Sequence, residues 1–151
     1  MNYVDEGQGP LLLMLHGNPT WSYLYRHMIA QLSDDFRCVA PDLIGYGLSD
    51  KPADADYSME AHARRLGLFI DKLDLSDITL VCQDWGGVIG LAHASANKER
   101  FSGLVPMNTA GFVPMLPAGL LALKGAWAFP YLWMYKTPIL GKRMAMDWNL
   151  F

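Results

Sequence analysis

The sequence predicts an α/β protein with a mostly parallel sheet that is covered by helices on both faces. Two observations support this fold class. Short apolar runs alternate along the chain with longer segments that have helical periodicity. Apolar residues make up 52% of the 151 residues and charged residues 18%, which is typical of a globular chain with a real core.

The apolar runs predict four parallel strands, and the segments between them predict helices. We expect the sheet to have the spatial order 36–42, 11–17, 77–83, 103–108, so that the last strand lies at an edge with unpaired backbone groups. The helices are predicted over 21–32, 58–73 and 86–98, with Ser58 as the N-cap of the second.

Charge and cysteine usage exclude several classes of function. The net charge of −3 and the lack of a basic run give no electrostatic footprint for nucleic acid. The first ten residues, MNYVDEGQGP, do not look like a signal peptide, so we expect a cytoplasmic protein. Cys38 and Cys82 fall in predicted buried strands, which indicates core packing rather than a disulfide or a metal site. Neither a metal nor a cofactor is expected.

Residues 112–135 differ in character from the rest of the chain. This stretch, FVPMLPAGLLALKGAWAFPYLWMY, carries one charge, Lys124, and is long enough to span a membrane. Pro114, Pro117 and Pro130 interrupt it, which favours an apolar helical lid over a ligand cavity instead. We therefore predict a core domain over 1–111 and the start of a helical cap domain over 112–151, without a membrane span.

Asp84 stands where a predicted strand meets a predicted helix. The order strand, Cys82-Gln83-Asp84-Trp85-Gly86, helix is the layout of a nucleophile elbow, whose sharp turn requires small residues two positions to either side. The N-terminus of the following helix also favours an anion at this point. The alternative is that Asp84 only caps that helix.

An aspartate in the elbow indicates a particular reaction. An aspartate carboxylate is ionised at neutral pH, so it can attack without a general base. It can displace a leaving group at a saturated carbon and form an ester, which water must then hydrolyse.

The segment HGNPTWSYLYR (16–26) supplies supporting groups. It follows the first strong strand, at the sheet edge where ligands bind in open parallel sheets. The backbone N–H groups of Asn18 and Trp85 are predicted to form an oxyanion hole. The Asn18 amide and the Trp85 indole are neutral donors suited to a departing halide. Taken singly, Asn18 could be a turn former and Trp85 a packing aromatic.

Three segments together identify a family resemblance: HGNPTWSYLYR, PDLIGYGLSDKP (41–52) and VCQDWGG (81–87). In order and spacing they resemble the haloalkane dehalogenases of the α/β-hydrolase superfamily, over residues 3 to 111. The resemblance implies an α/β-hydrolase fold and a small apolar, haloalkane-like substrate that reacts with water. It also implies Asp84 as nucleophile, with Asn18 and Trp85 as halide donors and oxyanion-hole amides.

The chain departs from this family in its histidines. The family uses a late histidine as base, oriented by an acid, whereas the histidines here are His16, His27, His62 and His93. We expect His16 to support its turn and the other three to be surface or packing residues. The resemblance thus implies an N-terminal portion with five of the usual eight strands, and with the base and the acid elsewhere. Such a chain alone is expected to form at most one stable alkyl adduct on Asp84.

Three other functions remain open from the sequence. Asn108 stands where one branch of the family has its acid. Together with Asn18 and Trp85, it resembles the branch that includes the β-lactone decarboxylases. Epoxide hydrolases share the elbow aspartate, and Tyr131 and Tyr135 would then be the ring-oxygen donors. The chain could also be a non-catalytic remnant that binds ligands or partners.

Overall fold

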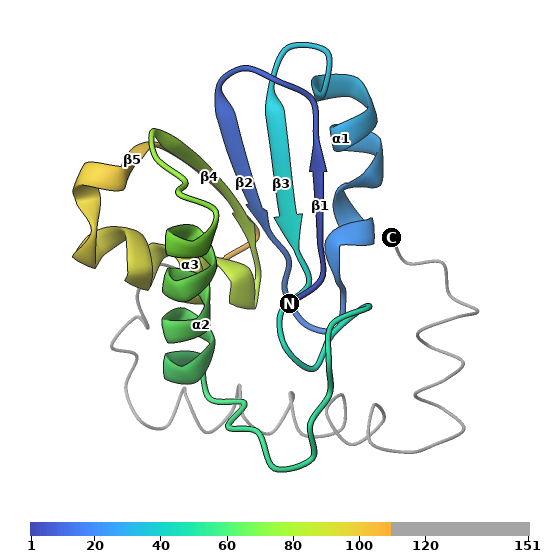
Figure 1. Ribbon diagram of the computed structural model, residues 1–151, viewed down its shortest axis with the longest axis vertical. Coiled ribbons are helices and arrows are strands. Elements are labelled where there is room, and N and C mark those ends of the chain that lie inside the picture. Colours follow the sequence, from blue (N-terminus) through green and yellow to red (C-terminus); the bar gives the residue numbers. More distant parts are fainter. Residues whose placement is uncertain (110–151) are drawn as a thin grey trace. The chain divides into compact units, whose positions relative to one another are not determined.

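The computed structural model describes residues 1–109, which form a five-stranded sheet with flanking helices (Figure 1). The strands are β1 (Tyr3–Glu6), β2 (Leu11–Leu15), β3 (Arg37–Pro41), β4 (Ile78–Gln83) and β5 (Phe101–Met107). The helices are α1 (Arg26–Leu32), α2 (Met59–Lys72) and α3 (Trp85–Ala96), with short 3₁₀ helices η1 (Ser22–Tyr25) and η2 (Lys98–Arg100). The chain divides into two compact units, Met1–Phe112 and Val113–Phe151, and all described residues belong to the first.

The sheet has the order β1-β3-β2-β4-β5. Strands β3, β2, β4 and β5 pair in parallel, which confirms the predicted order of the four apolar strands. Strand β1 pairs antiparallel with β3, with Tyr3 opposite Pro41. Its sequence, YVDE, is too short and too polar to be recognised as a strand from its pattern.

Each face of the sheet has its own apolar core. Along β2, Leu11, Leu13 and Leu15 pack in the core that includes residues of α2 and α3, such as Leu66 and Ile89. The intervening residues of β2 pack in the core that includes residues of η1 and α1. The strand is buried along its whole length, so it reads as a continuous apolar run rather than as an alternating pattern.

Two helices agree with prediction, and one begins differently. The Ala61 N–H donates to the Ser58 hydroxyl oxygen at 3.2 Å, so Ser58 caps α2 as predicted. The segment predicted as one helix over 21–32 begins with the 3₁₀ turn η1. This turn holds the Tyr25 ring in the core, where its hydroxyl donates to the Leu15 carbonyl at 2.7 Å.

Strand β5 is an edge within residues 1–109, where it pairs with β4 alone. Because one side of β5 is unpaired there, apolar residues of the strand are exposed, with Leu104 53% and Val105 44% exposed. Cys38 and Cys82 are free thiols and are buried, as predicted.

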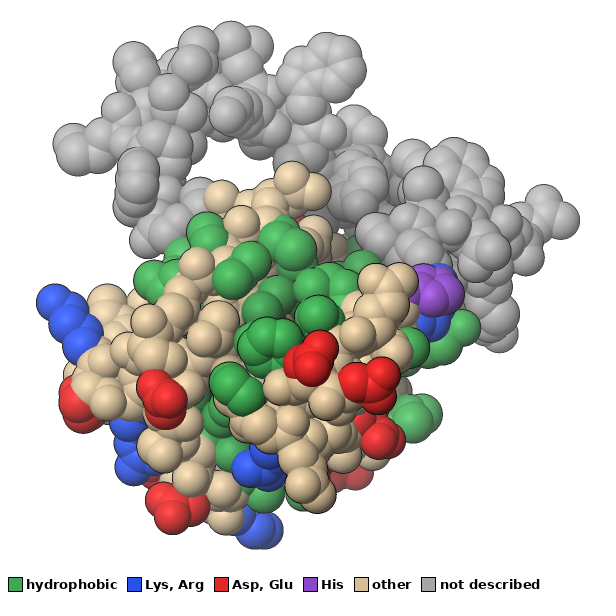
Figure 2. All heavy atoms as spheres, turned by 90° about the horizontal axis from the view of Figure 1, so that it is seen from above, with side chains coloured by type: hydrophobic (Ala, Val, Ile, Leu, Met, Phe, Trp, Pro, Cys, Tyr) green, Lys and Arg blue, Asp and Glu red, His purple; other side chains and the backbone are tan. Residues whose placement is uncertain are grey.

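The described surface mixes charge types. Figure 2 shows one face on which acidic and basic side chains are scattered around a central group of apolar ones. No helix within residues 1–109 is long and apolar enough to cross a membrane, and the stretch 112–135 lies outside the described residues.

Candidate active site

Polar residues follow the carboxyl end of each parallel strand. His16, Gly17 and Asn18 follow β2, Asp42 follows β3, Asp84 follows β4, and Asn108 and Thr109 follow β5. Because the strands are parallel, these segments meet at one edge of the sheet, the edge where ligands bind in open α/β folds. His16 and Gly17 were predicted to continue the β2 strand, but they belong to the loop that turns toward this edge.

Asp84 occupies a strained turn between β4 and α3. Its backbone has φ 52° and ψ −123°, a conformation that costs a non-glycine residue about 1–3 kcal/mol. Although it stands at the N-cap position of α3, its side chain makes no capping hydrogen bond. A Cβ on Gly86 would overlap the carbonyl oxygens of Leu15 and His16, so the turn needs glycine there. This geometry favours the elbow over the simple helix cap.

The loop that follows β2 donates a hydrogen bond to the Asp84 carboxylate. The backbone N–H of Asn18 donates to Asp84 Oδ1 at 2.9 Å. The two segments approach so closely that a Cβ on Gly17 would overlap the Asp84 carboxyl group. The structure therefore brings together Asp84 and Asn18, which are 66 residues apart in the sequence.

The Asn18 side chain has a partner of its own. The Tyr46 hydroxyl donates to Asn18 Oδ1 at 3.5 Å, the outer limit of a hydrogen bond. Burial raises the pKa of Tyr46, and the negative charge of Asp84 raises it further, so the hydroxyl keeps its proton.

Trp85 borders an open hollow beside Asp84. Its side chain is 39% exposed, and the hollow has a volume of about 340 Å³. The remaining lining residues are Met59, Val88, Asn108 and Thr109. All three predicted site residues thus lie at this edge of the sheet.

His16 is a structural residue, as expected from the sequence. Its ring is fully buried, and Nε2 accepts a hydrogen bond from the Leu43 N–H at 3.0 Å. The ring proton is then on Nδ1, which donates to the Gly17 carbonyl at 2.9 Å. Burial lowers the pKa of His16 and so keeps the ring neutral.

Within residues 1–109, the hydrogen bond to the Asp84 carboxylate comes from the Asn18 N–H and from none of the four histidines. His62 is buried beside Tyr46 and Tyr57, and His93 packs against Phe101. His27 is exposed on α1. Burial lowers the pKa of both His62 and His93.

Asp42 also lies at this edge of the sheet, although no role was predicted for it from the sequence. Its buried carboxylate accepts from the N–H groups of Ser22 and Leu48, each at 2.8 Å, and from the Asn2 amide at 3.1 Å. Burial raises its pKa, but these hydrogen bonds outweigh burial and lower it overall. Asp42 therefore ties the loop after β3 to the segment after Asn18. An acidic residue directly after a buried strand was the available signal.

Cys82 and possible metal ligands are further features of the described part of the chain. Burial raises the pKa of the Cys82 thiol to about 11, so it stays protonated. Residues 1–109 contain no cluster of three or more histidine, cysteine or acidic side chains that could hold a metal ion.

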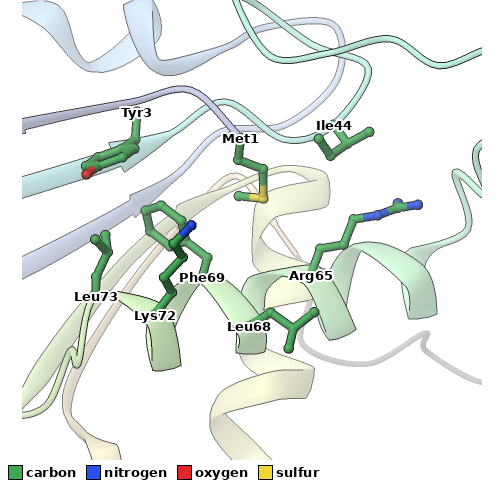
Figure 3. Close-up of a pocket in the computed structure, with 8 residues that line it drawn as sticks. All are labelled: Met1, Tyr3, Ile44, Arg65, Leu68, Phe69, Lys72 and Leu73. Carbon is green, nitrogen blue, oxygen red and sulfur yellow. The ribbon is translucent and has the colours of Figure 1, made fainter.

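A second hollow lies against α2 and does not include the candidate site residues. It has a volume of about 430 Å³, and Figure 3 shows Arg65, Leu68 and Lys72 from α2 around it, together with Met1 and Tyr3. Its lining contains neither Asp84 nor Asn18 nor Trp85, the residues that the sequence predicted for the site. Tyr131, Tyr135 and the predicted cap, 112–151, lie outside the described residues.

Comparisons with known proteins agree with this architecture. A model of the α/β-hydrolase fold family matches residues 10–143. Haloalkane dehalogenase 2 of Mycobacterium tuberculosis is 48% identical over 82% of this chain and 42% of its own length. Cis-3-alkyl-4-alkyloxetan-2-one decarboxylase of Shewanella oneidensis is 39% identical over the whole chain and 46% of its own length.

Solved structures show the same similarity. Haloalkane dehalogenase DpaA from Paraglaciecola agarilytica NO2 superimposes with a TM-score of 0.71 and is 45% identical over 81% of this chain and 43% of its own. An epoxide hydrolase from Bacillus megaterium gives a TM-score of 0.67 and 39% identity over 72% of this chain and 38% of its own.

The chain spans less than half the length of the curated relatives described above. The family model, by contrast, matches most of the chain, and it includes strands β2 to β5 and the turn that carries Asp84. This chain belongs to the α/β-hydrolase fold family.

Proposed function

We propose that this chain carries the nucleophile of a hydrolase that cleaves carbon–halogen bonds through a covalent alkyl ester of Asp84. The observation that carries the proposal is the position of Asp84, in a strained strand-to-helix turn with its Oδ1 bound by the Asn18 N–H. The similarity to haloalkane dehalogenases supports the choice of reaction.

In the first step, a carboxylate oxygen of Asp84 attacks the carbon that bears the halogen. The new C–O bond forms as the carbon–halogen bond breaks, and the halide leaves with the bonding pair. The Trp85 indole N–H and the Asn18 side-chain amide stabilise the departing halide as neutral donors.

In the second step, water hydrolyses the ester. Its oxygen adds to the Asp84 carbonyl carbon while a general base takes one of its protons, and the backbone N–H groups of Asn18 and Trp85 stabilise the oxyanion. The alcohol then leaves with the second proton as the carboxylate re-forms. A general base is worth about 10²–10⁴-fold in such a step. None of the four histidines is placed to act on this ester, so our proposal assigns the base to a residue outside 1–109.

A second candidate function is decarboxylation of a β-lactone. It is favoured by the similarity of the whole chain to the Shewanella decarboxylase and by Asn108 beside Asp84 in the hollow. Epoxide hydrolysis is the third candidate, and the similarity to the Bacillus enzyme supports it.

Product analysis distinguishes these functions. The full protein is incubated separately with a bromoalkane, a cis-dialkyl β-lactone and a terminal epoxide, and bromide, carbon dioxide with alkene, and diol are measured. Bromide release that is lost in Asp84→Asn is the expected result. Carbon dioxide or diol as the sole product would move the assignment to the corresponding alternative, and no product in any assay would favour a binding protein.

A further inference from the structure

Thr109, the residue two positions after β5, makes a contact with the elbow that the reaction above does not use. Its hydroxyl donates to the backbone carbonyl oxygen of Asp84 at 2.6 Å. The Gly87 N–H donates to the same oxygen at 3.0 Å. The carbonyl of the proposed nucleophile is therefore held by two donors, one from its own helix and one from the neighbouring strand end.

Gly87 makes room for this contact. A Cβ at position 87 would overlap the Oγ1, Cγ2 and Cβ atoms of Thr109. The second glycine of the Trp-Gly-Gly sequence therefore has a specific partner, whereas the first, Gly86, packs on the end of β2.

The hydrogen bonds to the Asp84 carbonyl oxygen also fix the direction of the Trp85 N–H. The peptide unit between Asp84 and Trp85 is planar and trans, so its C=O and N–H bonds point in opposite directions. Fixing the Asp84 oxygen therefore also fixes the Trp85 N–H. Asp84 combines φ 52° with ψ −123°, a sparsely populated conformation, and ψ is the angle that sets the direction of this peptide. The two hydrogen bonds to the Asp84 oxygen restrain that angle.

We propose that Thr109 is a positioning residue that aims the Trp85 N–H at the oxyanion of ester hydrolysis. The inference rests on the proposed covalent mechanism and deepens it. During hydrolysis, water adds to the ester carbon and an electron pair moves onto the carbonyl oxygen, where the negative charge needs donors. The alkylation step develops no charge there, because it converts a carboxylate into a neutral ester. Loss of the Thr109 hydroxyl therefore slows the second step selectively.

The test is transient kinetics of the full protein with a bromoalkane, using bromide release for alkylation and intact mass for the ester. Thr109→Val keeps the side-chain shape without the hydroxyl, and Thr109→Ser keeps the hydroxyl. We expect Thr109→Val to hydrolyse its ester at least about tenfold more slowly, since removal of a direct oxyanion donor costs about 10²–10³-fold. Its alkylation rate should stay within about twofold of the native rate, and Thr109→Ser should restore hydrolysis. Gly87→Ala, which displaces Thr109, should also accumulate the ester.

Several results would overturn the inference. Native hydrolysis in Thr109→Val would show that the hydroxyl does not position the donor, and so would an equal loss in both steps that Thr109→Ser does not rescue. If Thr109→Val does not fold, as judged by thermal unfolding, Thr109→Ala takes its place with the same expected accumulation of ester. If the native protein forms no Asp84 ester, the proposed function fails first and the inference fails with it.

Discussion

Asp84 has a backbone conformation that few residues other than glycine adopt, with φ 52° and ψ −123°. The sequence predicted its place between strand and helix, because small residues lie two positions away on each side. It also predicted the approach of Asn18, because both residues follow neighbouring parallel strands.

The contacts of two other residues could not be found from the sequence, although the position of Asp42 directly after a buried strand was a signal. Thr109 and Asp42 act through backbone atoms of residues that are distant in the chain, and no spacing rule encodes such contacts. Only the assembled sheet edge reveals them.

Among single residues, the variant Trp85→Phe tests whether the indole N–H donates a hydrogen bond to the halide. Phenylalanine keeps an aromatic ring and the backbone N–H but removes the indole N–H. A hydrogen bond to a charged group is worth about 1.5–3 kcal/mol, so we expect halide affinity to fall by about 10- to 150-fold. Bromide binding is measured by titration of the full protein.

Trp21→Phe is the matched control, since Trp21 is exposed to almost the same degree, 38% against 39%, and lines a different hollow. It should bind bromide as the native protein does. Equal affinities in Trp85→Phe and Trp21→Phe would remove Trp85 from the halide site.

At the scale of elements, the turn after β4 depends on how closely α3 approaches β2. Gly86 lies against the carbonyl oxygens of Leu15 and His16, and Gly90 lies against the side chains of Leu15 and Leu80. The apolar strands and the α2 cap could be predicted because each has a local pattern. Strand β1 and the 3₁₀ turn η1 could not, since long-range pairing and the buried Tyr25 determine them.

Gly86→Ala tests this contact. The added Cβ overlaps backbone atoms, which cannot rotate away, so α3 must move from β2. Overpacking of this kind costs about 1–3 kcal/mol, and we expect the free energy of unfolding to fall by that amount in urea titrations.

Ser95→Ala provides the control on the same helix, because Ser95 is exposed and, within residues 1–109, its side chain hydrogen-bonds only to the Ala92 carbonyl of its own helix. It should change stability by less than about 0.5 kcal/mol. A Gly86→Ala variant as stable as Ser95→Ala would show that the close approach of α3 is not required.

At the scale of the whole molecule, the mixed sheet has a core on each face, and its four parallel strands bring their carboxyl ends together at one edge. The order of those strands followed from their apolar composition and from the helical crossovers between them. The loops that meet at this edge depend instead on buried polar residues such as His16, whose ring joins the loop after β2 to Leu43.

His16 makes the stability of the fold depend on pH. Because its folded pKa lies below the ordinary value of 6.5, the unfolded chain binds a proton at this residue at a higher pH than the folded chain does. Its contribution to stability is therefore complete above pH 6.5 and is lost as the pH falls from there toward the folded pKa.

The expected loss is at most about 1.4 kcal/mol per pH unit for one histidine. His16→Gln can keep an acceptor for the Leu43 N–H without titrating, so its unfolding free energy between pH 7.5 and 5.5 should decrease less steeply. His62 and His93 contribute slopes of the same sign in both proteins. An unchanged slope in His16→Gln would contradict the buried, neutral assignment.

Attack of Asp84 on the substrate carbon can be followed in a single turnover in ¹⁸O-labelled water. With the full protein in excess over a bromoalkane, the alcohol oxygen must come from Asp84, because water adds to the ester carbonyl carbon. We predict an unlabelled alcohol and one ¹⁸O in the peptide that contains Asp84. Labelled alcohol with an unlabelled Asp84 would mean that water attacks the substrate directly, and the covalent mechanism would be wrong.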